Sequence, residues 1–237
     1  MGQTGCSLDA YGQMDACNFA VDPDSLEGRV CYGGLDLSST TDITAFVLVF
    51  PPEDEDDKYT ILPFFWIPED NIDLRVRRDH VMYDLWERQG YLQTTEGNVV
   101  HYGYIEKFIE ELGKRYNTRE IAFDRWGAVQ MVQNLEGMGF TVVPFGQGFK
   151  DMSPPTKELM KLTLERKIAH GGHPVLRWMM DNIYIRTDPA GNIKADKEKS
   201  TEKIDGAIAT IMGLDRAIRC GNDNGASVYD ERGILFV

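Results

Sequence analysis

Four aspartates in this chain lie in sequence contexts that are unusual for solvated surface residues. Asp36 ends the stretch VCYGGLD, Asp42 precedes the apolar run ITAFVLVF, and Asp124 ends IAFD. Asp205 lies in TEKIDGAIATIMGL, where helical spacing places it on one face with three apolar residues. An ionised carboxylate on an apolar face is costly unless it meets a cation. The four acids therefore predict a site that binds cations.

Three or four carboxylates that converge on one edge of a sheet repel one another strongly. Mg²⁺ and Mn²⁺ are hard cations that take oxygen ligands, so either ion would relieve this repulsion. Two such ions about 4 Å apart can activate a water and stabilise the departing oxygen in phosphodiester cleavage. No single aspartate is specific, but the combination predicts metal-dependent hydrolysis.

Each acid also has a simpler structural explanation. Asp42 could form or cap the turn in SSTTD, and Asp124 could cap the helix that follows it. Asp205 could pair locally with Lys203 or Arg125. These alternatives stay open on the sequence alone.

The apolar pattern predicts an α/β fold in which helices lie on the faces of a mixed sheet. Strands are expected over residues 30–36, 43–50, 59–67, 118–124 and 140–146. The first three read as neighbours joined by turns, and the last two flank a helix at 126–139, which implies parallel pairing. Asp124 would then lie at the carboxyl end of a parallel strand, where open α/β sheets carry their active sites.

Helices and one further hairpin account for the rest of the pattern. Helices are expected over 74–90, 104–116, 174–182 and 201–218, and from the capping sequence Ser153-Pro154-Pro155 to the glycines at 171–172. A hairpin is expected over 183–197.

Length and composition exclude several classes of protein. The chain has 237 residues, 42% hydrophobic and 27% charged, which is ordinary for a globular protein with a sizeable core. No apolar run approaches the roughly 20 residues of a membrane span, and the N-terminus lacks the features of a signal peptide. The four cysteines form no C-x-x-C pair, which favours a reducing compartment over a disulfide framework or zinc site.

The net charge of −13 argues at first against nucleic acid. However, residues 1–57 hold 12 acids and a single base, whereas residues 150–203 carry a net charge of +3. Four lysines approach and enter the Asp205 helix, and we expect them to contact DNA phosphates: Lys194, Lys197, Lys199 and Lys203. The alternative is a solvated loop.

Residues from about 30 to 220 resemble the nuclease domain of the large terminase subunit of tailed bacteriophages, and within it the HK97-type lineage. GGLDLSSTTDITAF, IAFDRWGA and DKEKSTEKIDGAIATIMGLDRA resemble the three motifs of that family, in the same order. The lysine-rich sequence that runs into Lys-Ile-Asp-Gly is the most distinctive. The resemblance implies a ribonuclease-H-like fold, with a mixed central sheet flanked by helices on both faces. It also implies a two-metal endonuclease that cuts concatemeric viral DNA during packaging.

The resemblance also assigns roles to residues of this sequence. It implies that Asp36, Asp124 and Asp205 are the catalytic, metal-binding acids and that Asp42 is an auxiliary ligand of two Mg²⁺ or Mn²⁺ ions. It places the hairpin at 183–197 beside the DNA. The implied partners are double-stranded DNA, the portal protein and the small terminase subunit, at the procapsid in the bacterial cytoplasm.

Large terminase subunits also carry an ATPase motor, but this sequence has no G-x-x-x-x-G-K-[ST] phosphate loop. We therefore expect an isolated, monomeric nuclease domain over 28–221. Residues 1–27 would be a linker or tail remnant, and residues 222–237 a C-terminal tail. The acidic balance predicts weak DNA affinity for such a domain by itself.

Three other classes of protein stay open on the sequence. A resolvase, transposase or integrase of the same fold would also use three acids. An actin-like or sugar-kinase-type ATPase would use GLDLSSTTDITA as a phosphate loop, but it would need a second domain and an Asp-x-Gly-Gly loop. A catalytically silent module would keep the fold without binding metal. Metal binding and ATP turnover distinguish these classes.

Overall fold

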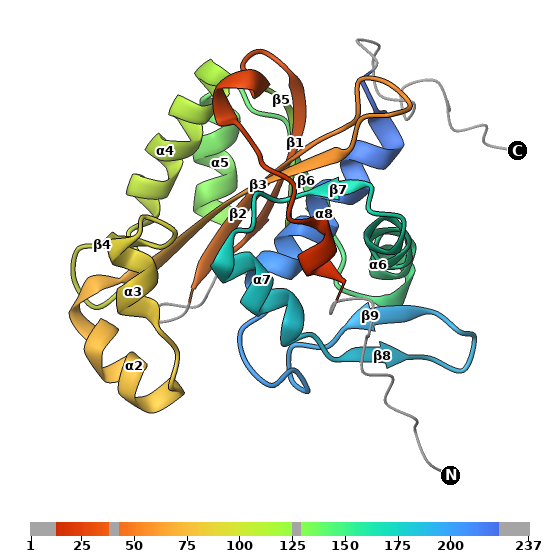
Figure 1. The fold of residues 1–237 in the computed structure, drawn as a ribbon. Coiled ribbons are helices and arrows are strands. Elements are labelled where there is room, and N and C mark those ends of the chain that lie inside the picture. Colours follow the sequence, from red (N-terminus) through yellow and green to blue (C-terminus); the bar gives the residue numbers. More distant parts are fainter. Residues whose placement is uncertain (1–12, 38–42, 125–128, 223–237) are drawn as a thin grey trace, which may run out of the picture.

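A mixed β-sheet forms the centre of the molecule in the computed structural model, which describes residues 13–37, 43–124 and 129–222 (Figure 1). Within these residues the sheet has seven strands in the order β4-β3-β2-β1-β5-β6, with β7 paired to β3. A separate two-stranded sheet, β8-β9, projects as a hairpin. None of the helices in the described ranges is long and apolar enough to cross a membrane.

The five strands expected from the sequence are confirmed to within about two residues. The strands of the central sheet are β1 (Val30–Asp36), β2 (Thr44–Phe50), β3 (Tyr59–Pro68), β4 (Gln93–Thr95), β5 (Asn117–Asp124), β6 (Val142–Phe145) and β7 (Ile168–Ala169). The β1-β2 and β2-β3 pairs are antiparallel, whereas β5 pairs in parallel with both β1 and β6. The short strands β4 and β7 pair in parallel with β3 and were not expected.

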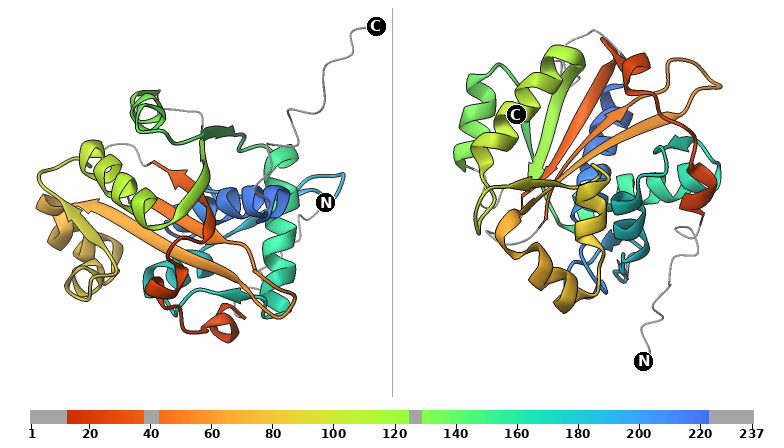
Figure 2. Two further views of the ribbon diagram at one scale, coloured as in Figure 1. Left: turned by 90° about the horizontal axis from the view of Figure 1, so that it is seen from above. Right: turned by 60° about the vertical axis from the view of Figure 1, so that its left-hand side comes forward.

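Helices cover both faces of the sheet. The α-helices are α2 (Ile72–Asp79), α3 (Tyr83–Arg88), α4 (Tyr102–Arg115), α5 (Val129–Gly137), α6 (Phe149–Leu164), α7 (Pro174–Asp181) and α8 (Asp205–Cys220). Figure 2 shows α4 and α8 on opposite sides of the strands, with α5 on the side of α4. The hairpin strands β8 (Ile185–Thr187) and β9 (Ile193–Ala195) confirm the hairpin expected at 183–197.

Burial on both faces explains the unbroken apolar run of β2. Its alternate side chains Phe46, Leu48 and Phe50 belong to the core beneath α4 and α5. The intervening residues Val47 and Val49 belong to the core beneath α8. A strand that is covered on both faces has no polar side, so its sequence reads as a continuous apolar run.

Helix α8 lies against β1 at very short distance. A Cβ added at Gly34 would lie 1.8 Å from the carbonyl oxygen of Ala209, so no side chain fits there. Gly213 faces the same strand, because a Cβ at that position would lie 3.2 Å from the Gly34 nitrogen. A glycine inside a strand is typical of such a close approach. This contact fixes the end of β1 relative to the start of α8.

One continuous helix was expected over 74–90, and this expectation is wrong. The chain forms two helices there, α2 and α3, which are separated at residues 80–82. His80 takes a φ of 55°, in the left-handed region, and this interrupts the helix. The apolar spacing did not reveal the break, because Ile72 and Val76 of α2 and Tyr83 and Trp86 of α3 all contact the same core at helical spacing.

The expected bounds of the helix after residue 150 are also wrong. Helix α6 begins at Phe149 with Gly148 as its N-cap, so Ser153, Pro154 and Pro155 lie inside the helix. It ends at Leu164 and not at the glycines 171–172, because β7 intervenes. The paired prolines each lack one donor, and the helix begins more than a turn before them.

Residues 13–27 pack against the domain, although a linker or tail was expected there. Two short 3₁₀ helices lie in this segment, η1 (Met14–Cys17) and η2 (Pro23–Leu26), and a third, η3 (Glu69–Asn71), precedes α2. Met14 and Cys17 are fully buried, and Leu26 is nearly so. His170 Nε2 lies 2.8 Å from the Met14 carbonyl oxygen.

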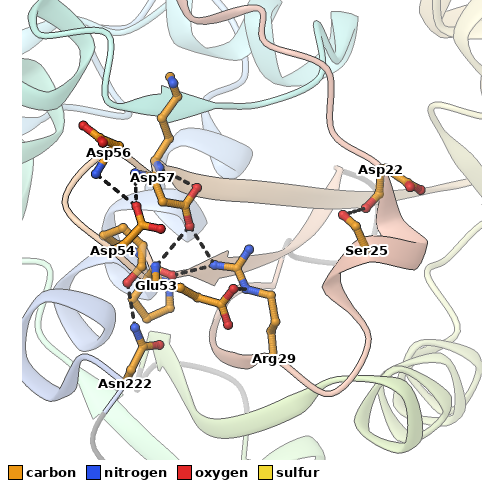
Figure 3. Close-up of polar contacts among 11 residues, drawn as sticks. Asp22, Ser25, Arg29, Glu53, Asp54, Asp56, Asp57 and Asn222 are labelled. Carbon is orange, nitrogen blue, oxygen red and sulfur yellow. Dashed lines mark hydrogen bonds and ion pairs between the residues drawn. The ribbon is translucent and has the colours of Figure 1, made fainter.

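The acidic loop between β2 and β3 is organised by one arginine (Figure 3). The Arg29 guanidinium lies 3.6 Å from Glu53 and 3.1 Å from Asp57. Asp54 accepts hydrogen bonds from the backbone of Asp56 and Asp57, which closes the turn. Much of the acid excess of the first quarter of the chain is therefore in a surface loop.

Candidate metal centre

Two of the sequence-predicted acids lie side by side at one edge of the sheet. Strands β1 and β5 run in parallel with Leu35 opposite Phe123, so that Asp36 and Asp124 end neighbouring strands. Asp205 is the first residue of α8, the helix that packs on β1. Asp36 and Asp205 are only 2% and 8% exposed, whereas Asp124 is partly buried.

A lysine bridges the two most buried acids. The Lys197 ammonium lies 2.6 Å from Asp36 Oδ2 and 3.0 Å from Asp205 Oδ1, and it donates a hydrogen bond to each. The carboxylates thus converge from a strand and a helix that are far apart in sequence. They meet on a cation, as their apolar contexts indicated.

The electrostatics of the site follow from this burial. The pKa of Asp36 is raised to about 7, chiefly by burial and to a smaller extent by nearby Asp205 and Asp124, against the opposing effect of Lys197. Burial acts to lower the pKa of Lys197, but the carboxylates of Asp36 and Asp205 outweigh it and raise that pKa. The influence of Asp124 on Asp36 shows that all three acids belong to one electrostatic environment.

The full set of expected ligands is not assembled among the described residues. Within the ranges that the structure describes, no three or more His, Cys, Asp or Glu side chains are grouped closely enough to hold a metal ion. Asp42 lies outside the described residues, as do residues 125–128 that follow Asp124. Among the expected ligands, Asp36 and Asp205 are joined through Lys197.

Asp124 lines a cleft of about 300 Å³ whose walls also carry basic residues. These are Arg186 and Lys194 of the hairpin, with Lys197 beyond it. Lys194 donates a hydrogen bond to the Gln147 carbonyl oxygen at 3.2 Å and lies over the Phe149 ring. Arg186 lies over the same ring. The hairpin therefore presents cations beside the acids, a geometry suited to a phosphate backbone.

The four expected DNA-contacting lysines have different surroundings. Lys194 and Lys197 line the cleft with Asp124, whereas Lys203 lines a second cleft with Asp205. Lys199 lies over the Tyr184 ring, 5.4 Å from its centroid. Lys197 contacts two carboxylates, which its position in a lysine-rich loop did not suggest.

Sequence reasoning missed two contributors to this site. Arg186 occupies the first strand of the hairpin, and an isolated arginine in IYIRT gives little signal. Asp196 is buried, and its Oδ1 accepts hydrogen bonds from the backbone nitrogens of Glu198 and Lys199. The sequence signal for such a turn is an aspartate, whose side chain can accept a hydrogen bond from the backbone nitrogen two residues later.

Comparison with known proteins identifies the class of this fold. The nuclease domain of the large terminase of phage G20c with bound magnesium aligns over 90% of this chain and 98% of its own, with a TM-score of 0.55 and 11% identity. The SPP1 large terminase nuclease domain with bound Mn aligns over 84% of this chain and 92% of its own, with a TM-score of 0.52 and 13% identity. The fold is therefore ribonuclease-H-like, with a mixed sheet flanked by helices.

Relatives with higher sequence identity, and a family model, show which family within this class the chain belongs to. The large terminase subunit of Enterobacteria phage HK97 is 40% identical over 191 residues, which are 80% of this chain and 38% of that protein. Its crystal structure matches with a TM-score of 0.77 and 36% identity, over 87% of this chain and 43% of that one. The family model "Terminase large subunit, endonuclease domain" matches residues 7–220. The chain belongs to this family, and it spans less than half the length of the HK97 protein.

Proposed function

We propose that this chain is a divalent-metal-dependent endodeoxyribonuclease that cuts concatemeric viral DNA during genome packaging. Asp36, Asp124 and Asp205 are its catalytic, metal-binding acids, with Asp42 as an auxiliary ligand. The observation that carries the proposal is the pair of buried carboxylates, from β1 and α8, that share one cation at the edge of the sheet. Membership of the terminase endonuclease family supports it.

The residues present fit Mg²⁺ or Mn²⁺. The acids supply oxygen donors only, which hard cations prefer. Asp36 and Asp205 already bind the Lys197 ammonium, so a positive charge is electrostatically favourable at that place. Related nuclease domains were crystallised with bound magnesium and manganese. When bound, two such ions supply Lewis acidity for water activation and for stabilising the leaving oxygen.

The residues of this chain contribute position and charge to the reaction. The close contact of Gly34 with Ala209 holds the ends of β1 and α8 in a fixed relation, so the two buried acids need no rearrangement to converge. Arg186 and Lys194 contact the phosphates of the DNA strand beside the acids. Burial keeps bulk water from Asp36 and strengthens each charge interaction there.

The substrate and partners follow from the same family membership. We propose double-stranded DNA as substrate, and the portal protein and small terminase subunit as partners, at the procapsid in the bacterial cytoplasm. Residues 28–221 form most of the nuclease unit, and the burial of Met14 and Cys17 together with the family match from residue 7 supports an earlier start for it than residue 28.

Plasmid cleavage tests the proposal. Supercoiled plasmid is incubated with the protein in Mn²⁺, Mg²⁺ or EDTA, and nicked and linear products are quantified. We expect cleavage in either metal, none in EDTA, and a loss of at least about a hundredfold in Asp205→Ala. Asp56→Ala, at an exposed position of the loop between β2 and β3, is the matched control. A wild-type protein that leaves the plasmid intact in both metals contradicts the proposal.

A further inference from the structure

The Lys197 ammonium occupies the position between the two carboxylates that a divalent cation would need. It contacts Asp36 Oδ2 at 2.6 Å and Asp205 Oδ1 at 3.0 Å. A divalent cation seated between these same two oxygen atoms would lie where the ammonium lies, and the two positive charges would repel each other there. A metal ion bound between these two oxygen atoms must therefore displace the ammonium.

The backbone around Lys197 is held firmly, so displacement has to occur in the side chain. Asp196 accepts two backbone hydrogen bonds through Oδ1, and its own nitrogen donates to the Tyr184 carbonyl oxygen at 2.9 Å. Ser200 Oγ donates to the Asp196 carbonyl oxygen at 2.7 Å. The hydrogen bonds on either side of Lys197 fix its Cα at the edge of the site.

The Lys197 side chain has room to move. It is 45% exposed, although its ammonium contacts two buried carboxylates. Clefts of about 300 Å³ lie on both sides of it, one with Asp124 and the hairpin, the other with Asp205 and Lys203. A flexible lysine stem can leave the acids for either cleft without any change in the backbone.

We propose that Lys197 is an internal counter-ion that competes with the divalent metal for Asp36 and Asp205, an inference that rests on the proposed metal centre. In the metal-free protein Lys197 bridges the two carboxylates, offsets part of their negative charge and keeps the site assembled. Metal binding releases its ammonium into the cleft. The apparent metal affinity is therefore lower than that of the carboxylates alone.

Lysine labelling in the wild-type protein tests the displacement directly. An amine-reactive reagent is applied in EDTA or in Mn²⁺ without DNA, and mass spectrometry gives the labelling rate of each lysine. We expect Mn²⁺ to raise the rate at Lys197 about tenfold or more, since two charge-assisted hydrogen bonds no longer protect it. Lys199, two residues away, should label equally in both conditions. An unchanged rate at Lys197 in metal-saturated protein overturns the proposal.

Calorimetry of Mn²⁺ binding provides the second test. We expect Lys197→Met to bind Mn²⁺ roughly tenfold to a hundredfold more tightly than wild type, because the competing hydrogen bonds are gone. Its metal-free melting temperature should fall, since two buried acids lose their counter-ion. Lys199→Met should keep wild-type affinity within about twofold. If Lys197→Met does not fold without metal, Lys197→Gln takes its place.

The outcomes separate this proposal from the proposed function. A folded Lys197 variant that binds Mn²⁺ no more tightly than wild type overturns the competition. If the wild-type protein still binds Mn²⁺ and cuts plasmid, the nuclease proposal stands. If neither protein binds Mn²⁺, both proposals are contradicted.

Discussion

Asp36 is the residue on which the electrostatics of the site depend. It is almost fully buried, and its carboxylate faces a lysine and two other acids. The sequence predicted that Asp36 meets a cation, because a carboxylate at the end of an apolar strand needs one, and the Lys197 ammonium lies beside it. It did not identify Lys197 as that cation in the metal-free protein. Sequence distance hides the contact, since 161 residues separate Asp36 from Lys197.

The raised pKa of Asp36 predicts how the metal-free stability depends on pH. Burial raises the pKa of Asp36 in the folded protein to about 7, whereas the unfolded chain loses this proton near 3.8; above pH 7 the ionised carboxylate pairs with Lys197. The folded state thus binds more protons between these values, so the contribution of Asp36 to the free energy of unfolding falls as pH rises from 4 to 7. Asp36→Asn should remove this slope and raise the melting temperature at pH 7 by a few degrees.

Thermal unfolding in EDTA at several pH values between 4 and 8 measures this effect. Asp56→Asn, at an exposed position of the loop between β2 and β3, serves as the control for a general change of charge. If the melting temperature of Asp36→Asn depends on pH as steeply as that of the wild type, the pH dependence does not come from Asp36 and the prediction is contradicted.

At the scale of elements, the site depends on two strands and one helix whose ends coincide. Strand β2 and helix α8 were predictable because each carries a long, regular apolar pattern. Strands β4 and β7 have three and two residues, too few for any period to be detected. The break at His80 and the early start of α6 also escaped prediction, because each depends on local backbone conformation. The β8-β9 hairpin was predicted, but its packing beside Asp124 required the tertiary structure.

The contact between β1 and α8 predicts a severe effect at Gly34. Gly34→Ala should lower the free energy of unfolding by about 3 kcal/mol or more, because its Cβ would overlap the Ala209 carbonyl oxygen. Gly103→Ala, in α4 with open space around it, should be neutral or stabilising by about 0.5–1 kcal/mol. Urea denaturation measures both variants. Equal stabilities would show that the contact is looser than described.

The hairpin predicts a change in DNA binding that leaves the metal centre intact. The double variant Arg186→Ala, Lys194→Ala should weaken DNA binding and reduce the slope of log K against log salt by about two. Fluorescence anisotropy with a labelled duplex in Ca²⁺ gives the slope, and Mn²⁺ calorimetry should show wild-type metal affinity. If the double variant has the same slope of log K against log salt as the wild type, the hairpin does not contact the DNA phosphates and the prediction is contradicted.

At the scale of the whole molecule, residues 13–27 belong to the packed body of the protein. Met14 packs in the core with α6 and α7, whereas Leu26 packs in the core of the opposite face. Composition alone gave no sign of this, because small and polar residues dominate the segment. The few buried side chains in it lack periodicity.

This packing predicts that the segment is required for stability. Met14→Ala should destabilise the protein by roughly 2–5 kcal/mol, the usual cost of truncating a fully buried methionine. Leu74→Ala, at a residue that is 62% exposed, should change stability by less than about 0.5 kcal/mol. Chemical denaturation compares the two. If Met14→Ala is as stable as the Leu74→Ala control, residues 13–27 do not contribute to the stability of the domain and behave as a tail.

The most direct test of the metal centre is a crystal structure of the protein soaked in Mn²⁺, with anomalous diffraction recorded to locate the metal. We predict an anomalous peak about 2.1 Å from carboxylate oxygens of both Asp36 and Asp205, with the Lys197 ammonium displaced from them. A peak that lies elsewhere, or a site in which Lys197 still bridges the two acids at saturating Mn²⁺, would contradict the central claim.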